Sequence, residues 1–518
     1  MNFAKENKYV KWAILISLIN FVLRLLVGSF TNLGNDEVYY RVFALYPDWS
    51  HFDHAPMVGW LIQLTTFNLC FSHEIFFRIG PLLFSLLNLF LLFKFVEKIS
   101  DKKAAFLAIV LYNVSFYASI VSGLFIMPDS PMLTFWLLGL FYFYAALIHE
   151  NPSRKFNTDI LLAGLFTGLS MLSKYHGGIL WFSAGFFVLI YRRFWLKKPE
   201  LYIAVILSLI AFSPVLWWNV QNDFISFTFH GNRVSLLESG INLQYFAQEL
   251  LGQIGYNNPF LWLIFVLSII HFKRTFSDKE RDKGIFFLWF SLPLVFLFLF
   301  VSLFRFTLPH WSGPAFVTAI IPASIYLTKN WGKTQRRFII AAIILYFSVI
   351  LISFIHIKTG FLLPESKIKN DPSSELAGWK DLNKSFSQIR KSHLETKIIN
   401  ENHFMLSNKW FPAAHLDMYL ASPNKLKLYV YGDLEQTHKF AWINDYRGGI
   451  KKGQDAYFIT SNTSFRDPNE SLSNYFEKIL PPDTVILSRF SKPYRTHYIY
   501  LLKNYNGINF FEKAPNMK

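Results

Sequence analysis

Long apolar runs alternate with short polar segments over the first two thirds of the 518-residue chain. A helix needs about 17 to 25 consecutive apolar residues to cross the hydrocarbon core of a bilayer. Eleven segments have roughly that length, and the pattern therefore predicts a polytopic α-helical membrane protein. The predicted spans are 11–30, 76–97, 104–121, 130–149, 158–173, 176–191, 200–219, 258–272, 284–304, 311–328 and 337–357.

The pattern changes after residue 357, where polar and apolar residues mix in shorter pieces. Residues 371–391 have the pattern of an amphipathic helix, with Asp371 or a following Ser near its N-cap. Pieces rich in β-branched and aromatic residues predict strands. These pieces are 396–400, 425–431, 455–460, 483–490 and 497–503. We predict a transmembrane domain over residues 1–357 and a soluble α/β domain over residues 358–518.

Composition agrees with a membrane protein, since 53% of the residues are hydrophobic and only 16% are charged. The formal net charge of +17 would suggest nucleic acid in a soluble protein. In a membrane protein, basic loops on the cytoplasmic face explain the charge better, and we predict no nucleic-acid partner. The single cysteine, Cys70, excludes an internal disulfide.

Basic residues are unequally divided between the alternate loops. With the N-terminus placed inside, the inside loops contain 22 Lys and Arg residues, and the outside loops before the C-terminal domain contain five. Because basic residues gather on the cytoplasmic side, we predict a cytoplasmic N-terminus. The odd number of spans then places the C-terminal domain outside.

Acids, histidines and cations gather in the five predicted outside loops. The first of them reads "GNDEVYYRVFALYPDWSHFDHAPM" and contains Asp36 and Glu37. Further polar residues follow in the other four loops: Asp129, Lys174, His176, His230, Arg233, Arg305 and His310. Each has a structural alternative, such as a turn or helix cap for an acid or a headgroup contact for a cation. The convergence of five loops on one face favours a site.

Three residues of the first loop, His51, Asp53 and His54, are of types that bind metal ions. Their spacing is nonspecific, so a divalent metal stays an open alternative. No Gly-rich nucleotide-binding loop occurs in the sequence, and the residues require no cofactor.

The polar motifs, taken in order, resemble the bacterial branch of the GT-C glycosyltransferases. These are the protein-mannosyltransferase and aminoarabinose-transferase relatives, described as RgtA/B/C/D-like. The likeness is clearest over residues 10–320 and rests on "GNDEVYYRVFA", "HFDHAPMVGWL", "MPDSPMLTFWLL", "GLSMLSKYHGGIL", "PVLWWNVQNDFISFTFHGNRV" and "PHWSGPAF". The chain has "HAP" where the family often has "HPP" or "KPP".

The resemblance implies a GT-C fold and an enzyme that takes sugar from a polyprenyl-phosphate donor, usually undecaprenyl phosphate, on the periplasmic face. It implies that Asp36 is the catalytic acid of the first outside loop. Asp129 matches a second catalytic acid of the family, which could orient the acceptor or hold a basic partner. A carboxylate suits the general base that activates an acceptor hydroxyl, with Glu37 as the fallback for Asp36. A leaving lipid phosphate needs cations. The candidate donor-phosphate and substrate-binding residues are His54, Lys174, His176, Arg233, Arg305 and His310.

These observations predict an inverting hexosyl or pentosyl glycosyltransferase of the bacterial inner (cytoplasmic) membrane, with a periplasmic C-terminal domain. Its acceptor would be lipopolysaccharide or lipid A, another envelope glycan, or protein. One alternative is a transporter or flippase for a lipid-linked sugar. Such proteins place polar groups at the membrane midplane, whereas these lie in loops. The other alternative is a non-catalytic membrane protein that binds glycan.

Overall fold

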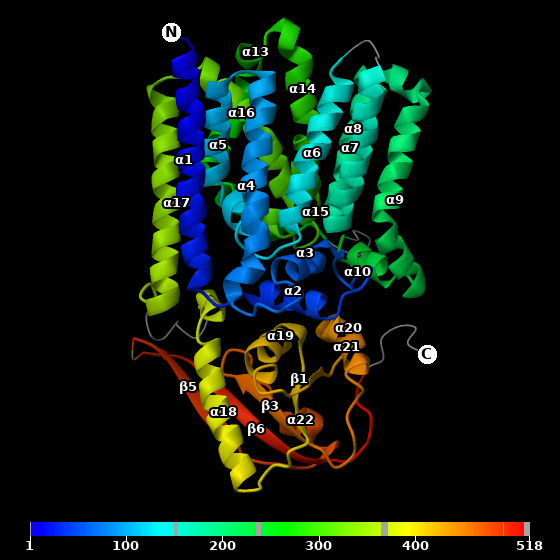
Figure 1. Cartoon of the computed structure of the whole chain (residues 1–518), viewed down its shortest axis with the longest axis vertical. Coiled ribbons are helices and arrows are strands. Elements are labelled where there is room, and N and C mark those ends of the chain that lie inside the picture. Colours follow the sequence, from blue (N-terminus) through cyan, green and yellow to red (C-terminus); the bar gives the residue numbers. More distant parts are fainter. Residues whose placement is uncertain (1, 150–153, 235–239, 364–370, 491, 512–518) are drawn as a thin grey trace. The chain divides into compact units, whose positions relative to one another are not determined.

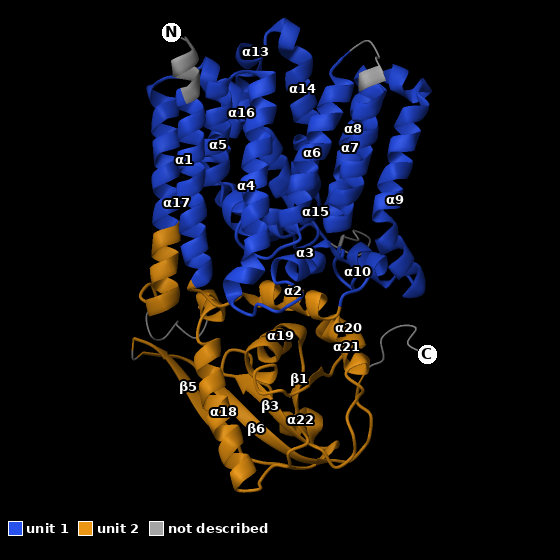
Figure 2. Ribbon diagram, viewed as in Figure 1, with its two compact units in different colours: residues 1–29, 47–349 blue, residues 30–46, 350–518 orange. Residues whose placement is uncertain are grey.

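The computed structural model describes residues 2–149, 154–234, 240–363, 371–490 and 492–511. Contacts divide the chain into two compact units (Figure 2). Residues 1–29 and 47–349 form the first unit, and residues 30–46 and 350–518 form the second. The predicted domain boundary after residue 357 stays a prediction. The contacts add a short segment between the first two predicted spans to the C-terminal unit.

The first unit is helical (Figure 1). Its long helices are α1 (Asn2–Ser29), α4 (Glu74–Ile99), α6 (Asp129–Leu147), α7 (Arg154–Ser173), α9 (Pro199–Gln221) and α17 (Lys333–Thr359), the last of which continues into the second unit. Its shorter α-helices are α3 (Met57–Thr65), α5 (Lys102–Val114), α8 (Ile179–Tyr191), α10 (Ile225–Val234), α11 (Leu243–Tyr256), α12 (Pro259–Ile270), α13 (Phe272–Thr275), α14 (Arg281–Trp289), α15 (Leu292–Ser302) and α16 (Gly313–Lys329). Single turns of other helix types are η1 (Tyr117–Val121), η2 (Tyr175–Gly178), η3 (Arg193–Lys197), η4 (Asp278–Glu280) and η5 (Pro309–Ser312).

Within the described residues, seven helical segments are long and apolar enough to cross a membrane. An eighth is added if α11 and α12, which meet at a bend of 98°, are counted as one span. These segments confirm a multi-pass membrane protein. All eleven predicted spans fall on helices, but α5, α8 and α16 have only 13, 13 and 17 residues. The count of eleven therefore stays a prediction.

Three helices present apolar side chains outward. The most apolar windows of α1, α9 and α17 are only 17%, 28% and 22% buried. In water such apolar surfaces would be unfavourable, whereas lipid chains cover them readily. The backbone groups of each helix are hydrogen-bonded within the helix and need no partner from the bilayer. These helices therefore face the bilayer.

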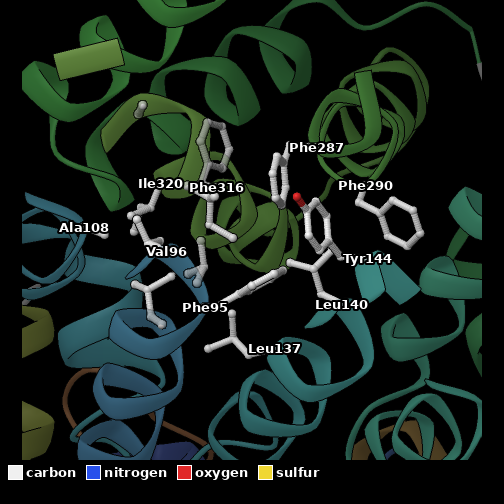
Figure 3. Packing of buried hydrophobic residues seen from close by; sticks show 14 of the residues in the cluster. Phe95, Val96, Ala108, Leu137, Leu140, Tyr144, Phe287, Phe290, Phe316 and Ile320 are labelled. Carbon is white, nitrogen blue, oxygen red and sulfur yellow. The ribbon is translucent and has the colours of Figure 1, made fainter. Parts of the chain in front are cut away.

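Aromatic side chains fill the interior of the helical unit (Figure 3). The ring of Tyr144 on α6 stacks on Phe287 of α14, with centroids 5.6 Å apart and an interplanar angle of 13°. Phe95 of α4 meets the edge of the same Phe287 ring at 6.0 Å. Helix α16 adds the ring of Phe316 and the aliphatic side chain of Ile320 to this cluster. These side chains fill the space between α4, α6, α14 and α16.

Helices α7 and α9 approach closely because small residues line their contact. Gly164 and Gly168 lie one turn apart on α7, and they face Ala204 and Ser208 of α9. A Cβ atom on Gly164 would lie 2.2 Å from the backbone oxygen of Ala204. The Ser208 hydroxyl also donates a hydrogen bond to the Gly164 carbonyl oxygen. This is the small-residue packing by which helices associate within membranes.

The second unit contains a mixed sheet flanked by helices (Figure 1). Its strands are β1 (His403–Ser407), β2 (Leu428–Val430), β3 (Asp455–Ser461), β4 (Phe476–Ile479), β5 (Asp483–Arg489) and β6 (Lys492–Tyr505). The order is β2-β1-β3-β6-β4, and β5 pairs with β6. Pairs β1–β2 and β1–β3 are parallel and the pairs of β6 are antiparallel. Its helices are α2 (Asn35–Leu45), η7 (Pro372–Leu376), α18 (Trp379–Glu395), α19 (Trp410–Leu416), η8 (Asp417–Ala421), α20 (Leu434–Thr437), α21 (Phe440–Tyr446) and α22 (Pro468–Leu472).

The predicted α/β character of the C-terminal domain is thus confirmed by a mixed sheet unit. Strand β4 was not predicted, and two further predictions need correction. Residues 396–400, predicted as a strand, form a turn after α18, and the first strand begins at His403. Asp371 caps the short helix η7 rather than α18, because its side chain accepts a hydrogen bond from the Ser373 N–H. Helix α18 instead begins after Gly378, whose φ of 84° favours glycine.

Residues 30–46 pack into this unit through helix α2. The ring of Tyr39 lies 4.7 Å from the Trp410 ring of α19. The Arg41 guanidinium forms an ion pair with Asp417 at 3.1 Å, between side chains that are 12% and 3% exposed. Aromatic and ionic contacts thus join a segment from the start of the chain to the C-terminal sheet unit.

We expect the substitution Gly164→Ala to destabilise the helical unit, because the added methyl group collides with the backbone of α9. Overpacking of this kind costs about 1–3 kcal/mol. The measurement is the melting temperature of the purified protein in detergent. Gly185→Ala on α8 is the matched control, since a Cβ there meets nothing within 4 Å. Equal melting temperatures for the two variants would contradict the close contact.

Candidate functional site

Several predicted site residues of the helical unit lie at helix ends or on a short helix. Asp129 is the first residue of α6, directly after Pro128. Lys174 is extended between the end of α7 and the 3-10 turn η2. His230 and Arg233 lie on the short helix α10. Proline and the breaks between helices thus place polar side chains at helix ends, where they leave the long apolar stretches uninterrupted.

A buried ion pair joins two of these segments. The Lys174 Nζ lies 2.8 Å from Asp129 Oδ2, and the two side chains are 6% and 0% exposed. The hydroxyl of Tyr117, in the π-helical turn η1, donates a hydrogen bond of 3.0 Å to Asp129 Oδ1. A buried charge is stable only when it is paired and hydrogen-bonded. Both oxygens of Asp129 are occupied, so this carboxylate is placed to hold Lys174.

A cavity of about 590 Å³ lies beside the ion pair. One part of its wall is polar, from His54, Lys174, His176, His230 and Arg233. The other part is apolar, from Leu297, Phe298, Phe300, Val301 and Trp311, among others. Most of the wall is apolar, and the cations stand among apolar side chains of α15. The arrangement suits a ligand with an anionic group and an apolar chain.

The histidines of the cavity are held by neighbours and are neutral at pH 7. His230 Nε2 lies 2.8 Å from the backbone oxygen of Asp53, and its ring centroid lies 6.3 Å from that of His54. Burial lowers the pKa of His54 to about 3, although the Asp53 charge opposes the shift. Burial also lowers the pKa of His230. The positive charge of the cavity therefore comes from Lys174 and Arg233.

Arg233 presents its charge at the exposed side of the cavity. The guanidinium carbon lies 5.5 Å from the ring centroid of Phe229 and 5.5 Å from that of Trp311. Both contacts have the geometry of cation–π pairs. The aromatic rings orient the side chain while the guanidinium stays exposed to solvent. An Arg in this position is able to bind a phosphate through two parallel hydrogen bonds.

Two predicted binding residues of the fifth loop lie apart from this wall. His310, in η5, does not line the cavity, but the charges of Asp129 and Lys174 both act on it. Burial, with a further contribution from Lys174, lowers the pKa of His310 to about 4. Arg305 follows α15 and is also not part of the cavity lining. Their proposed contacts with a donor phosphate stay predictions.

Asp36 and Glu37 belong to the C-terminal unit, on the first turn of α2. The Asp36 side chain is exposed. Glu37 is 3% exposed, and its Oε2 accepts a hydrogen bond of 2.9 Å from the Gly34 N–H. This contact caps the helix, as in a capping box. Of the two acids, Asp36 is the exposed one, whereas Glu37 is buried and caps the helix.

The weak metal candidates do not form a recognised cluster. Among the residues that the structure describes, no group of three or more His, Cys, Asp or Glu side chains is placed to hold a metal ion. His51 and Asp53 are buried at 0% and 6% exposure, and the His51 backbone N–H donates to the His54 carbonyl oxygen. These residues shape the loop that carries His54 to the cavity.

Sequence reasoning missed the second partner of Asp129 and the apolar wall. Tyr117 was inside a predicted span, where its hydroxyl was a signal that this stretch is not wholly lipid-facing. Trp311, the first residue of a predicted span, was not predicted to belong to the site. Its ring centroid lies 5.5 Å from that of Phe298, and the ring supports Arg233. The contributions of α15 follow only from tertiary packing.

The fold and the site together define a polytopic membrane protein with a cationic, lipid-compatible cavity and a C-terminal α/β unit. Residues 53–218 match the family model described as dolichyl-phosphate-mannose-protein mannosyltransferase. This segment contains His54, Asp129, Lys174 and His176. The match confirms the predicted resemblance to the GT-C glycosyltransferases and the predicted enzyme class, a glycosyltransferase.

Individual relatives agree with this class. The chain is 24% identical over 330 residues to the lipid A galacturonosyltransferase RgtD of Rhizobium johnstonii, a match that covers 62% of this chain and 67% of that protein. The crystal structure of ArnT from Cupriavidus metallidurans in the apo state has a TM-score of 0.62 and 14% identity, with 95% of this chain and 98% of ArnT covered. ArnT bound to undecaprenyl phosphate matches with a TM-score of 0.62 and 15% identity, over 94% of this chain and 98% of ArnT. These likenesses show an ArnT-like fold.

We expect the substitutions Lys174→Met and Asp129→Leu to destabilise the protein strongly, because each leaves one buried charge without its partner. Breaking a buried pair costs about 3–5 kcal/mol. The double variant, which removes both charges, should lose less than the sum of the two single variants. The measurement is the denaturation midpoint in detergent.

Lys94→Met is the control for that comparison. Lys94 pairs with Glu97 at 3.0 Å on the surface, where its side chain is 57% exposed. Such a pair contributes at most about 1 kcal/mol. Strictly additive losses at Lys174 and Asp129 would show that the two charges are not coupled.

We expect stability to fall as the pH is lowered from about 7 toward about 4, in part through His310. Its pKa is about 4 in the folded protein, against 6.5 as the ordinary value. Between these values the unfolded chain binds a proton that the folded protein does not, so acid favours unfolding. The measurement is the loss of melting temperature between pH 7.5 and pH 5.

His310→Gln should make that loss smaller, since glutamine does not titrate. His73→Gln is the matched control, because the His73 side chain is 50% exposed. An unchanged pH dependence in His310→Gln would contradict the buried neutral imidazole.

Proposed function

We propose that the protein transfers a sugar from a polyprenyl-phosphate donor, of the undecaprenyl-phosphate type, to an envelope acceptor. The observation that carries the proposal is the cavity in the helical unit, where Lys174 and Arg233 stand beside an apolar wall. Such a wall suits the first isoprene units of a lipid, and the two cations suit its phosphate. The ArnT structure with undecaprenyl phosphate supports the same donor class.

The acceptor is proposed to be lipid A or another part of lipopolysaccharide, because RgtD is named as a lipid A galacturonosyltransferase. The acceptor reaches the enzyme on the periplasmic face of the bacterial inner membrane. All eleven apolar segments cross that membrane, with the N-terminus in the cytoplasm and the C-terminal unit in the periplasm. The unequal distribution of basic residues supports this orientation.

The reaction is a single displacement at the anomeric carbon of the donor. Asp36 takes the proton from an acceptor hydroxyl, and the resulting oxygen forms a bond to the anomeric carbon. The bond from that carbon to the phosphate oxygen breaks, and polyprenyl phosphate leaves with the electron pair. The anomeric configuration is thereby inverted. The exposure of Asp36 and the engagement of Glu37 as a cap support this choice of base.

Lys174 and Arg233 stabilise the negative charge that grows on the leaving phosphate. A cation that is fixed before the reaction costs no reorganisation when charge develops. Lys174 is fixed by Asp129 and Arg233 by two aromatic rings. Asp129 thus acts as a positioning residue. His54 lines the same cavity and is neutral at pH 7, so it adds no charge beside the phosphate.

The test is transfer of sugar from an undecaprenyl-phosphate-linked donor to lipid A by the purified protein, followed by mass spectrometry. Asp36→Asn should lower kcat by about 10²–10⁴-fold, the range for loss of a general base. Asp381→Asn is the matched control on α18, since that side chain is 69% exposed. Transfer by Asp36→Asn at the rate of the unaltered protein would overturn the assignment of the base.

A further inference from the structure

A second cavity, of about 380 Å³, lies within the C-terminal unit. Residues of α18 and α19 and of the strands β3 and β6 line it, together with Asn35 of α2. The wall includes Trp379 and Phe411, and hydroxyl groups of Ser461 and Ser464. This combination of flat apolar side chains with several hydroxyls differs from the cationic cavity of the helical unit.

Buried polar atoms in this wall lack hydrogen-bond partners within the described part of the chain. They are His415 Nδ1, His497 Nε2 and Arg495 Nε, on side chains that are 1%, 4% and 8% exposed. Buried polar groups in folded proteins are nearly always hydrogen-bonded. Three such atoms around one cavity give a ligand that enters it three positions for hydrogen bonds.

The missing partners are of both kinds, donors and acceptors. His415 Nε2 lies 2.9 Å from Asn35 Oδ1, an acceptor, so Nε2 carries the proton and Nδ1 is left with a lone pair. The neutral His415 therefore requires a donor, whereas the Arg495 Nε–H requires an acceptor. A phosphate ion at pH 7 offers mainly acceptors, at its ionised oxygens, and few donors. A hydroxyl group donates and accepts, so a polyhydroxylated ligand fits both atoms.

The charges around the cavity agree with a ligand that is not strongly anionic. Arg495 is the cation of the wall, and Glu375 and Asp371 also line it. Asp371 is paired with Arg489 at 3.0 Å. Burial lowers the pKa of His497 to about 3, so its ring is neutral at pH 7. The positive charges of the arginines are thus balanced by the two carboxylates, and the histidine ring adds no charge that would attract an anion.

The rings in the wall are fixed by one another. The ring of Trp379 stacks on His415 with centroids 4.1 Å apart and an interplanar angle of 7°. The guanidinium carbon of Arg495 lies 5.8 Å from the Trp379 centroid, and Arg495 also donates a hydrogen bond to the Ser374 hydroxyl. A site whose side chains are held before binding loses little entropy when a ligand enters.

We propose that this cavity binds one sugar ring of the acceptor, recognised through its hydroxyl groups. The assignment to the acceptor rests on the proposed function. Asn35, which lines the cavity, directly precedes Asp36, the proposed general base, on α2. A sugar held against Asn35 is thereby recognised next to the residue that would activate the acceptor.

The experiment measures saccharide binding to the purified full-length protein without donor, by saturation-transfer NMR and calorimetry. The probes are the de-acylated glucosamine disaccharide of lipid A, intact lipid A in nanodiscs, and inorganic phosphate. Ser464→Trp fills the mouth of the cavity from an exposed position. Ser392→Trp, exposed on α18 and absent from the cavity lining, is the matched control.

We expect the disaccharide to bind to the unaltered protein, to Ser392→Trp and to Asp36→Asn. In Ser464→Trp its dissociation constant should rise at least tenfold, and the KM for lipid A should rise while the KM for the donor stays unchanged. His497→Phe, which keeps a ring of similar size, should also weaken binding. Binding of both the disaccharide and intact lipid A would assign recognition to the sugar rather than to the acyl chains.

Three results would overturn the proposal. Displacement of the disaccharide by inorganic phosphate would make the cavity an anion site. Equal affinity in Ser464→Trp and Ser392→Trp would place the sugar-binding site elsewhere. Absence of any saccharide binding would show that only water molecules bind the polar atoms of the cavity wall. These results differ from failure of the proposed function, in which the disaccharide binds as expected but no sugar is transferred from the lipid-linked donor.

Discussion

The ion pair between Lys174 and Asp129 is the constraint on which the helical unit depends. Two opposite charges lie inside an apolar bundle, and each is stable there only because the other is within 2.8 Å. The pair joins the end of α7 to the start of α6, and Tyr117 extends the connection to the turn after α5. Three helix ends are thereby held in register, and the ammonium group is held at the wall of the cavity.

The two cavities solve different recognition problems with different chemistry. The cavity of the helical unit has fixed cations beside apolar side chains, while its histidines lose their charge through burial. The cavity of the C-terminal unit has balanced charges, hydroxyl groups and ring nitrogens without partners among the described residues. Lipid phosphates are distinguished by charge and an apolar tail, whereas sugars are distinguished by the direction of their hydroxyl groups. The separation matches what a transferase with two chemically unlike substrates requires.

The apolar pattern predicted where helices form, since every predicted span falls on one helix or on two consecutive helical segments. It predicted their lengths less well, because α5 and α16 pack against other helices and need not match the bilayer alone. The site residues were predicted by type and loop, but Asp129 and Lys174 are 45 positions apart and only tertiary packing shows their contact. The β-branched residues of 396–400 predicted a strand, and this prediction was wrong. These residues form the turn that follows α18. Local propensity does not register such tertiary effects.

Residues 30–46 belong to the C-terminal unit although the helical unit separates them from it in the sequence. During synthesis, α2 emerges more than 350 residues before its partners Trp410 and Asp417. The contacts of Tyr39 and Arg41 can form only after the intervening helices and these partners have been synthesised. The segment that carries Asp36 therefore acquires its native surroundings only when the end of the chain has folded. Because of this order of synthesis, Asp36 reaches its final surroundings only after nearly the whole chain has been synthesised.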